Sequence, residues 1–119
     1  MGGPLTLELA DLDYCYLTTT GRVTGRPHRI EIWFAYRDGV AYLLNDSGKA
    51  DWVKNIRSNP AVRFDVGDGS WDGAGRIDLS PEEEAVARRL LVEKYTPRYS
   101  GDLTEWRDTA LPVAIDLSR

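Results

Sequence analysis

The dipeptide Asp38-Gly39 constrains the fold of this chain more than any other feature, because alternating apolar residues flank it. Every second residue of the preceding run, 28–37, is apolar or aromatic, and the run 40–44 that follows reads VAYLL. Asp-Gly readily adopts the positive φ angles that a type I′ turn needs at both central positions. The pattern therefore predicts an antiparallel β-hairpin. We interpret 28–37 as one continuous strand, with Ile30, Ile32, Phe34 and Tyr36 on one face and Arg29, Glu31 and Trp33 on the other.

The remaining elements follow from similar patterns. Further strands are expected at 14–20, 61–66, 70–79 and 111–117, each rich in β-branched, aromatic or alternating apolar residues. A short helix is predicted over 51–58, ending at Asn59-Pro60. A longer helix should begin after Ser80, which is followed by Pro81 and Glu83 in a capping-box arrangement, and run to about Tyr95. We expect it to bury Ala85, Val86, Leu90, Leu91 and Tyr95, and we expect another helical turn at 103–107.

These elements predict a mainly β (α+β) domain. Six antiparallel strands with a short inserted helix and one longer helix in the C-terminal half fit a closed or split β-barrel better than a sandwich. The 119 residues are interpreted as a single domain, in which residues 1–12 form a short leader. No GxGxxG motif joins a strand to a helix, so a Rossmann dinucleotide site is not expected.

A cationic turn interrupts the first two strands. The stretch TTTGRVTGRPHRIEIWF (18–34) carries Arg22, Arg26, His28 and Arg29, although the chain has a formal net charge of -4. Guanidinium groups pair bidentately with phosphate or carboxylate oxygens, and a glycine-rich turn adds backbone N–H donors. Gly21 and Gly25 bracket the turn and are expected to take positive φ angles. The turn is therefore either an anion site or a solvated hairpin loop, and its residues alone leave both open.

Several classes of function are disfavoured. Cys15 is the only cysteine and His28 the only histidine, so neither a disulfide framework nor a His/Cys metal site is expected, and Cys15 reads as a small buried thiol. The acidic composition, with a pI of about 4.9, argues against nucleic-acid binding. No apolar run is long enough to span a bilayer, and the N-terminus lacks the pattern of a secretory signal, so a cytoplasmic location is expected.

Four segments together resemble a known family. They are TTTGRVTGRPHRIEIWF, the Asp38-Gly39 hairpin, SGKADWVKNIRSNPAVRFDVG and the later EEEAVARRLLVEKY. The most specific feature is the pairing of the TTxGRxTGxP turn with the W-x-x-N-x-x-x-N-P exit of the short helix. The chain from about Tyr14 onward looks like the deazaflavin-dependent nitroreductases, within the flavin and deazaflavin oxidoreductases that share the FMN-binding split β-barrel. The resemblance implies the deazaflavin coenzyme F-420 as cofactor. It also implies hydride transfer to a nitro, quinone or enone acceptor, with no dedicated acid–base residue.

The resemblance also implies site residues. The expected coenzyme contacts are Arg22, Arg26 and His28 on the turn, Ser47, Gly48 and Lys49 in the loop after the third strand, and Trp52 and Asn55 on the short helix. The expected substrate wall is Tyr36, Tyr95, Tyr99 and Trp106. No catalytic residue is assigned. Val23 stands where relatives often carry a base, the leader is shorter than in many relatives, and Asp46 and Asp51 flank Lys49 and oppose anion binding.

Other interpretations stay open. FMN could replace the deazaflavin on the same barrel, because its phosphate would satisfy the same arginines, or the protein could bind a small molecule without catalysis. Trp52 could belong to the core, and Asn55 could bridge the helix to a strand. Trp33 or Trp71 could lie in the interface of a homodimer.

Overall fold

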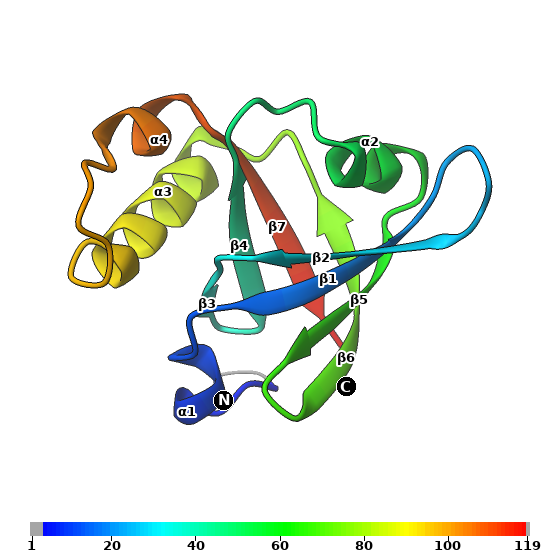
Figure 1. Ribbon diagram of the computed structural model, residues 1–119, viewed down its shortest axis with the longest axis horizontal. Coiled ribbons are helices and arrows are strands. Elements are labelled where there is room, and N and C mark those ends of the chain that lie inside the picture. The colour runs from blue at the N-terminus through cyan, green and yellow to red at the C-terminus, as the bar shows by residue number, and fades with distance from the viewer. Residues whose placement is uncertain (1–3, 119) are drawn as a thin grey trace.

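The computed structural model describes residues 4–118 and contains one curled sheet with four helices in that range (Figure 1). In chain order the elements are α1 (Leu7–Ala10), β1 (Cys15–Thr20), β2 (Pro27–Ile32), β3 (Ala35–Arg37), β4 (Val40–Asn45), α2 (Asp51–Ser58), β5 (Ala61–Val66), β6 (Gly69–Arg76), α3 (Pro81–Tyr95), α4 (Thr104–Thr109) and β7 (Leu111–Leu117).

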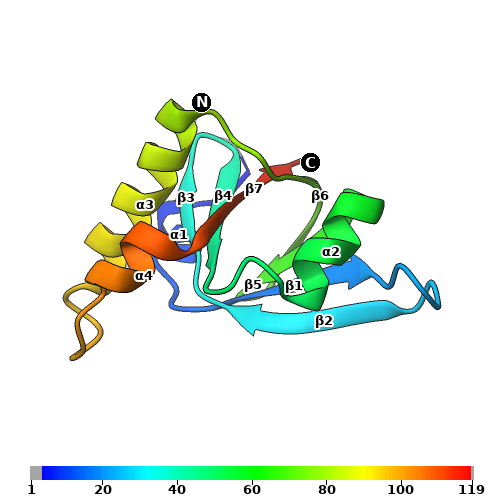
Figure 2. The ribbon, with the colours of Figure 1, turned by 90° about the horizontal axis from the view of Figure 1, so that it is seen from above.

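The sheet has seven strands in the order β2-β1-β5-β6-β7-β4-β3, and every neighbouring pair is antiparallel. Its two edge strands, β2 and β3, are consecutive in the chain and only two residues apart. The sheet must therefore curl so that its edges approach each other, which gives the expected split barrel. Figure 2 shows α3 and α4 on one side of the curled sheet and α2 on the other.

The predicted number of six strands was wrong. The run 28–37 was expected to be continuous, but it breaks at Trp33 and Phe34, between β2 and β3. Phe34 is fully buried and turns into the barrel, and its backbone N–H donates to the hydroxyl of Tyr95 instead of to a neighbouring strand. The first strands consequently form two separate hairpins, β1–β2 and β3–β4, and not one meander.

Two apolar cores lie on the two faces of the sheet. The barrel interior holds Leu17, Phe34, Phe64 and Ile115 with the buried side of α2. The second core, between the outer face of the sheet and α3, contains Tyr42, Leu44, Ala87, Leu91, Tyr95 and Ala114. The bounds and cap of α3 match the prediction, since the Ser80 hydroxyl accepts from the Glu83 N–H. Its buried face is rotated, however: Ala87 is buried where Ala85 is exposed, and Val86 and Leu90 are only half-buried.

Both hairpin turns are confirmed. Asp38 and Gly39 have φ angles of 49° and 86°, as a type I′ turn requires. Gly67 has a φ of 58° in the two-residue turn between β5 and β6. Strand β7 does not lie at an edge but in the sheet interior, where it pairs with β6 and β4.

Candidate coenzyme and acceptor site

The cationic hairpin is docked on α2 through Arg22. The Oδ1 atom of Asn55 accepts from the backbone N–H of Arg22 at 3.2 Å and from its guanidinium at 2.8 Å. The same guanidinium forms an ion pair with Asp51 at 3.2 Å. Asn55 is buried, and its amide N–H also donates to the hydroxyl of Thr19 on β1. Asn55 is therefore a structural bridge between β1, the hairpin and α2, which was one of the two roles expected for it.

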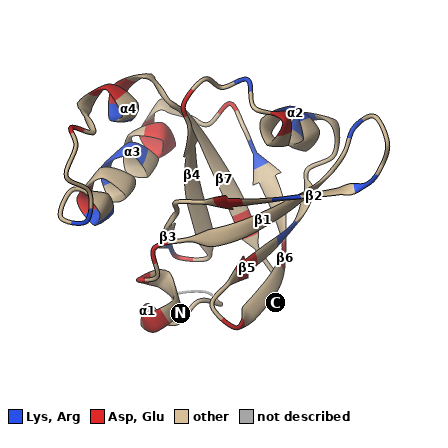
Figure 3. Cartoon of the chain, in the orientation of Figure 1, with Lys and Arg blue, Asp and Glu red and all other residues tan. Residues whose placement is uncertain are grey.

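Cations without a carboxylate partner concentrate around this junction. Within residues 4–118, most arginines form a salt bridge, including those on β6, α3 and α4. The arginines and lysines of that range that form none are Arg26 and Arg29 on the hairpin, Lys49 and Lys54 around α2, and Lys94 on α3. Figure 3 shows blue segments on the β1–β2 hairpin and on α2. This distribution leaves four cations there available for an anionic ligand.

A hollow of about 210 Å³ separates the hairpin from α2. Arg22, His28, Asp51 and Asn55 line it, together with Gly21, Val23 and Thr24. The His28 ring packs closely on Gly21, so that a Cβ there would lie 2.6 Å from Nε2 of His28 and the ring would have to shift. Gly25 has the expected positive φ angle, 75°, but Gly21 does not have one. Arg26 is exposed on the same hairpin but is not among the lining residues.

The loop between β4 and α2 connects this hollow to a larger cavity. Ser47 and Lys49 are exposed, and Gly48 between them has a positive φ of 68°. Ser47 lines the larger cavity, and Asp51, four residues later, lines the hollow. Trp52 is 6% exposed and belongs to the barrel core, so it supports α2 from inside.

The larger cavity has a volume of about 560 Å³ and aromatic walls. Trp33, from the break between β2 and β3, contacts Tyr99 edge-on at 5.5 Å and Trp106 of α4 edge-on at 5.7 Å between ring centroids. The other lining residues are Tyr14, Glu31, Ile32, Leu44, Asn45, Asp46, Ser47, Asp102 and Leu103. Pockets of this size and lining are typical of small-molecule sites. The cavity thus brings two residues of the expected substrate wall, Tyr99 and Trp106, next to one of the expected coenzyme contacts, Ser47.

Tyr95 and Tyr36 were expected in the same wall but lie elsewhere. Tyr95 is 1% exposed, and its ring stacks on Trp33 with centroids 4.1 Å apart, so it supports the wall from behind. Its hydroxyl is held by the backbone of Asp13 and Phe34, and burial raises the pKa of this phenol. Tyr36 lines a different hollow, next to α1, and its hydroxyl accepts from the N–H of Gly39.

Trp33 is the main lining residue that the sequence did not identify. It was placed on the outward face with Arg29 and Glu31, because the alternation runs unbroken through 28–37. Nothing in that pattern reveals the break that redirects the chain. The aromatic residues after α3 carried a clearer signal, since Tyr99 and Trp106 lie in a segment too polar for the core.

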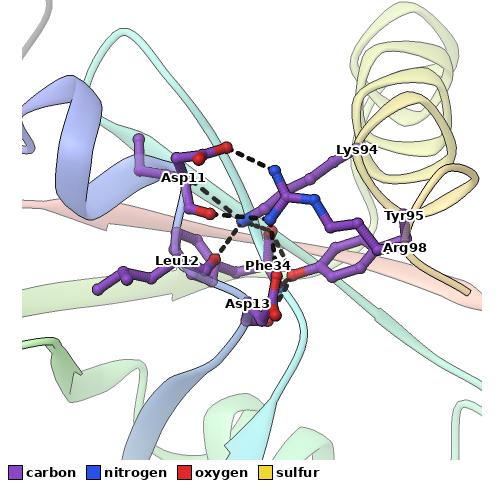
Figure 4. A network of polar contacts seen from close by, with 8 residues as sticks. Asp11, Leu12, Asp13, Phe34, Lys94, Tyr95 and Arg98 are labelled. Carbon is purple, nitrogen blue, oxygen red and sulfur yellow. Dashed lines mark hydrogen bonds and ion pairs between the residues drawn. The ribbon is translucent and has the colours of Figure 1, made fainter.

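A polar network fixes the leader against α3 and the strand break (Figure 4). The ammonium group of Lys94 donates to the carbonyl oxygens of Ala10, Leu12 and Phe34 at 2.7–3.1 Å. It also lies 3.7 Å from the centroid of the Phe34 ring. Burial lowers the pKa of Lys94 to about 8. Arg98 adds ion pairs to Asp11 and Asp13. The network holds residues 10–13 in place, directly before Tyr14 at the cavity.

Two absences apply to residues 4–118. They contain no group of three or more histidine, cysteine, aspartate or glutamate side chains that could hold a metal ion. None of the helices described there is long and apolar enough to cross a membrane. Cys15 is fully buried, as expected, and burial raises the pKa of its thiol.

The chain is similar in sequence to proteins of one known family. The profile of the F420H2-dependent quinone reductase family matches residues 1–118. An F420H2-dependent quinone reductase of Mycobacterium tuberculosis is 32% identical over 92 residues, which cover 71% of this chain and 60% of that protein. The chain thus matches less than two thirds of this curated relative.

Solved structures share the fold. A conserved hypothetical protein of Mycobacterium tuberculosis superposes with a TM-score of 0.69 at 26% identity, covering 96% of this chain and 79% of that one. A protein described as an F420-H2 dependent reductase has a TM-score of 0.70 at 24% identity, with 89% and 94% covered. A third, described as a domain-swapped dimer, has a TM-score of 0.70 at 24% identity, with 89% and 80% covered.

Proposed function

This chain belongs to the F420H2-dependent quinone reductase family, and from that premise we propose that it transfers a hydride from reduced coenzyme F-420 to a small activated acceptor of the quinone, nitro or enone type. The observation that carries the proposal is the position of the loop 46–50. This loop lines the cavity with aromatic walls at Asp46 and Ser47 and leads directly into α2. The loop, α2 and the hairpin together carry four cations that form no salt bridge with a described residue.

The residues present fit an anionic coenzyme. Arg26, Lys49 and Lys54 are exposed and have no carboxylate partner among the described residues, so phosphate or glutamate oxygens can pair with them without breaking an existing ion pair. Arg22 differs, because Asp51 and Asn55 already occupy its guanidinium. We therefore propose that Arg22 mainly organises the hollow, whereas Arg26 and Lys49 contribute most of the binding energy.

The bound coenzyme would supply the hydride chemistry. The protein's part is to position the acceptor and exclude water, and the aromatic wall of Trp33, Tyr99 and Trp106 suits that task. Tyr95 is not a suitable proton donor, since its phenol is buried and hydrogen-bonded to the backbone. Tyr99 is 48% exposed at the cavity, so it or solvent is the proposed source of any proton delivered to the acceptor.

The proposal is tested first by binding. Purified protein is titrated side by side with F-420 and with FMN, with intrinsic tryptophan fluorescence as the signal. F-420 should bind more tightly. Arg26→Ala and Lys49→Ala should each weaken its binding about tenfold, the equivalent of roughly 1.4 kcal/mol and near the lower end for a hydrogen bond to a charged group. Arg37→Ala is the matched control, because Arg37 pairs with Asp38 and lines neither the hollow nor the large cavity.

Turnover is tested next, as oxidation of the reduced coenzyme by a neutral naphthoquinone. Steady consumption that depends on both protein and quinone supports the reductase. Tighter binding of FMN than of F-420 would favour a flavin enzyme on the same barrel, and tight F-420 binding without turnover would favour a non-catalytic binding protein.

A homodimer is a separate part of the proposal. One structural neighbour is described as a domain-swapped dimer, and Trp71 remains partly exposed on β6. Trp33 is unsuited to such an interface, because it packs on Tyr95 and lines the cavity. Size-exclusion chromatography with light scattering distinguishes monomer from dimer, and a monomer at micromolar concentration would refute this part alone.

A further inference from the structure

The large cavity has a distinctive charge. Within residues 4–118, its lining includes Glu31, Asp46 and Asp102 but no lysine, arginine or histidine. None of these three carboxylates forms a salt bridge with a described residue. The cations without carboxylate partners lie instead on the hairpin and around α2. The aromatic cavity is thus acidic, whereas the neighbouring junction is basic.

Hydrogen bonds hold two of the three carboxylates in place. Glu31 accepts from the hydroxyl of Tyr16 at 2.7 Å, and the Arg29 guanidinium lies over the Tyr16 ring, 4.3 Å from its centroid. Asp102 accepts from the backbone N–H of Thr104 at 2.9 Å. Hydrogen bonding by Thr104, through its side chain first and its backbone N–H second, lowers the pKa of the Asp102 carboxyl group. Neither donor is a cation, so neither hydrogen bond places a positive charge on the carboxylate.

The aromatic walls favour the same class of ligand as the carboxylates. Indole faces carry negative electrostatic potential, so a cation near Trp33 or Trp106 is attracted and an anion is not. The same rings stack on a neutral aromatic ligand without regard to charge. An anionic ligand in the cavity would lie near three carboxylates that form no salt bridge with a described residue.

We infer that this cavity selects aromatic acceptors that are neutral or positively charged and discriminates against anionic ones, with Glu31, Asp46 and Asp102 as the specificity-determining residues. The inference rests on the proposed function for the identity of the reaction, and it adds the charge class of the acceptor. The magnitude follows from Coulomb's law: unit charges roughly 7 Å apart in water interact by an amount equivalent to about threefold in affinity for each carboxylate.

The test uses three naphthoquinones that share one ring and one linker, which ends in a hydroxyl, a sulfonate or a trimethylammonium group. At saturating reduced F-420 and low salt, kcat/KM for the cationic quinone should exceed that for the anionic one at least about tenfold. The preference should shrink in about 1 M salt, which screens charges over roughly 3 Å. Equal values, or a preference for the sulfonate, would overturn the inference.

Isosteric variants assign the effect to residues. The triple change Glu31→Gln, Asp46→Asn and Asp102→Asn removes the charges and retains acceptor oxygens for Tyr16 and Thr104. It should lower the cation-to-anion ratio at least about fivefold. Asp68→Asn is the control, because Asp68 is exposed in the turn between β5 and β6 and does not line the cavity. An unchanged ratio in the triple variant would contradict the assignment.

A binding measurement separates this inference from the proposed function. Each quinone is titrated without coenzyme, and quenching of tryptophan fluorescence gives its Kd. If no quinone is reduced but the order of affinity is cation, neutral, anion, the reductase proposal fails and the charge selectivity stands. If the neutral quinone is reduced but neither kcat/KM nor Kd depends on charge, only the selectivity fails.

Discussion

Removal of the Tyr95 hydroxyl gives the sharpest test of how the cavity wall is held. This hydroxyl donates toward the carbonyl oxygens of Asp13 at 2.7 Å and Phe34 at 3.0 Å, and it accepts from the Phe34 N–H at 3.0 Å. Tyr95→Phe keeps the ring that stacks on Trp33 and deletes only these bonds. The change therefore isolates the polar connection between α3 and the strand break.

The expected destabilisation follows from the accounting of those bonds. Loss of the hydrogen bond lowers the free energy of unfolding by about 1 kcal/mol, and leaving the buried Phe34 N–H without an acceptor lowers it by about a further 1–2 kcal/mol. The Phe34 carbonyl keeps the ammonium group of Lys94 as a donor, so it adds little. We expect Tyr95→Phe to lower the free energy of unfolding by about 2–3 kcal/mol and Tm by roughly 10 °C.

Urea denaturation followed by circular dichroism measures this loss. Tyr99→Phe is the control: Tyr99 is 48% exposed, and its change should stay within about 0.5 kcal/mol. Quinone affinity of Tyr95→Phe should remain within about twofold of wild type, because Trp33 keeps its stacking partner. A loss of stability below about 0.5 kcal/mol would refute the reasoning, and so would a large loss of affinity in a variant that is still folded.

Three further changes test other parts of the structure. Folding lowers the pKa of Lys94 from 10.5 to about 8, so between pH 8 and 10.5 the unfolded chain keeps a proton that the folded chain has released. The free energy of unfolding of wild type should therefore rise with pH over this range, relative to that of Lys94→Met, in denaturation experiments. A fall relative to the variant would contradict this. Asp51→Asn should tighten F-420 binding about two- to fivefold in titrations, because Asp51 competes with the anionic coenzyme for Arg22 through an exposed ion pair. Weaker binding would instead mean that Asp51 helps to position Arg22 for the coenzyme. Gly75→Ala would place a Cβ 2.7 Å from the side chain of the buried Ile56 of α2. Denaturant melts should show a free energy of unfolding lower by about 1–3 kcal/mol, and an unchanged value would mean that α2 can move away from β6 at no cost.

Elements with local signals could be predicted from the sequence. The cap at Ser80, the Asp38-Gly39 turn and the proline after Asn59 act over a few residues. The structure confirms the bounds of α2 and α3 and the turn between β3 and β4, although not the start of β3. The strand break at Trp33 and Phe34 depends on Tyr95, whose hydroxyl accepts from the backbone N–H of Phe34, 61 residues earlier in the chain. No local pattern encodes a partner so distant.

The same distinction between local signals and contacts of distant residues applies to the candidate site. Arg22, His28 and Asn55 were expected together and do line one hollow, because the hairpin that carries two of them docks on the helix that carries the third. The sequence could not indicate that Asp51 and Asn55 would occupy the Arg22 guanidinium, since this depends on side-chain geometry across 29 and 33 residues. Likewise, Tyr95 and Tyr99 are four residues apart, but helical geometry buries the first, and the second lies beyond the end of α3 at the cavity.

The division of charge between the two halves of the site bears on how a ligand would be oriented. The sign of the charge changes within the loop 46–50, with Asp46 at the acidic cavity and Lys49 three residues later, next to the start of α2. A molecule with an anionic tail and an uncharged ring can satisfy both halves in only one direction, with its tail at the hairpin and its ring toward Trp33. The reverse orientation would place the tail against three carboxylates, each opposing it by about threefold in affinity at roughly 7 Å. The net charge of the chain therefore says little about its ligand, because the separation of charge along one short loop is what would orient the bound molecule.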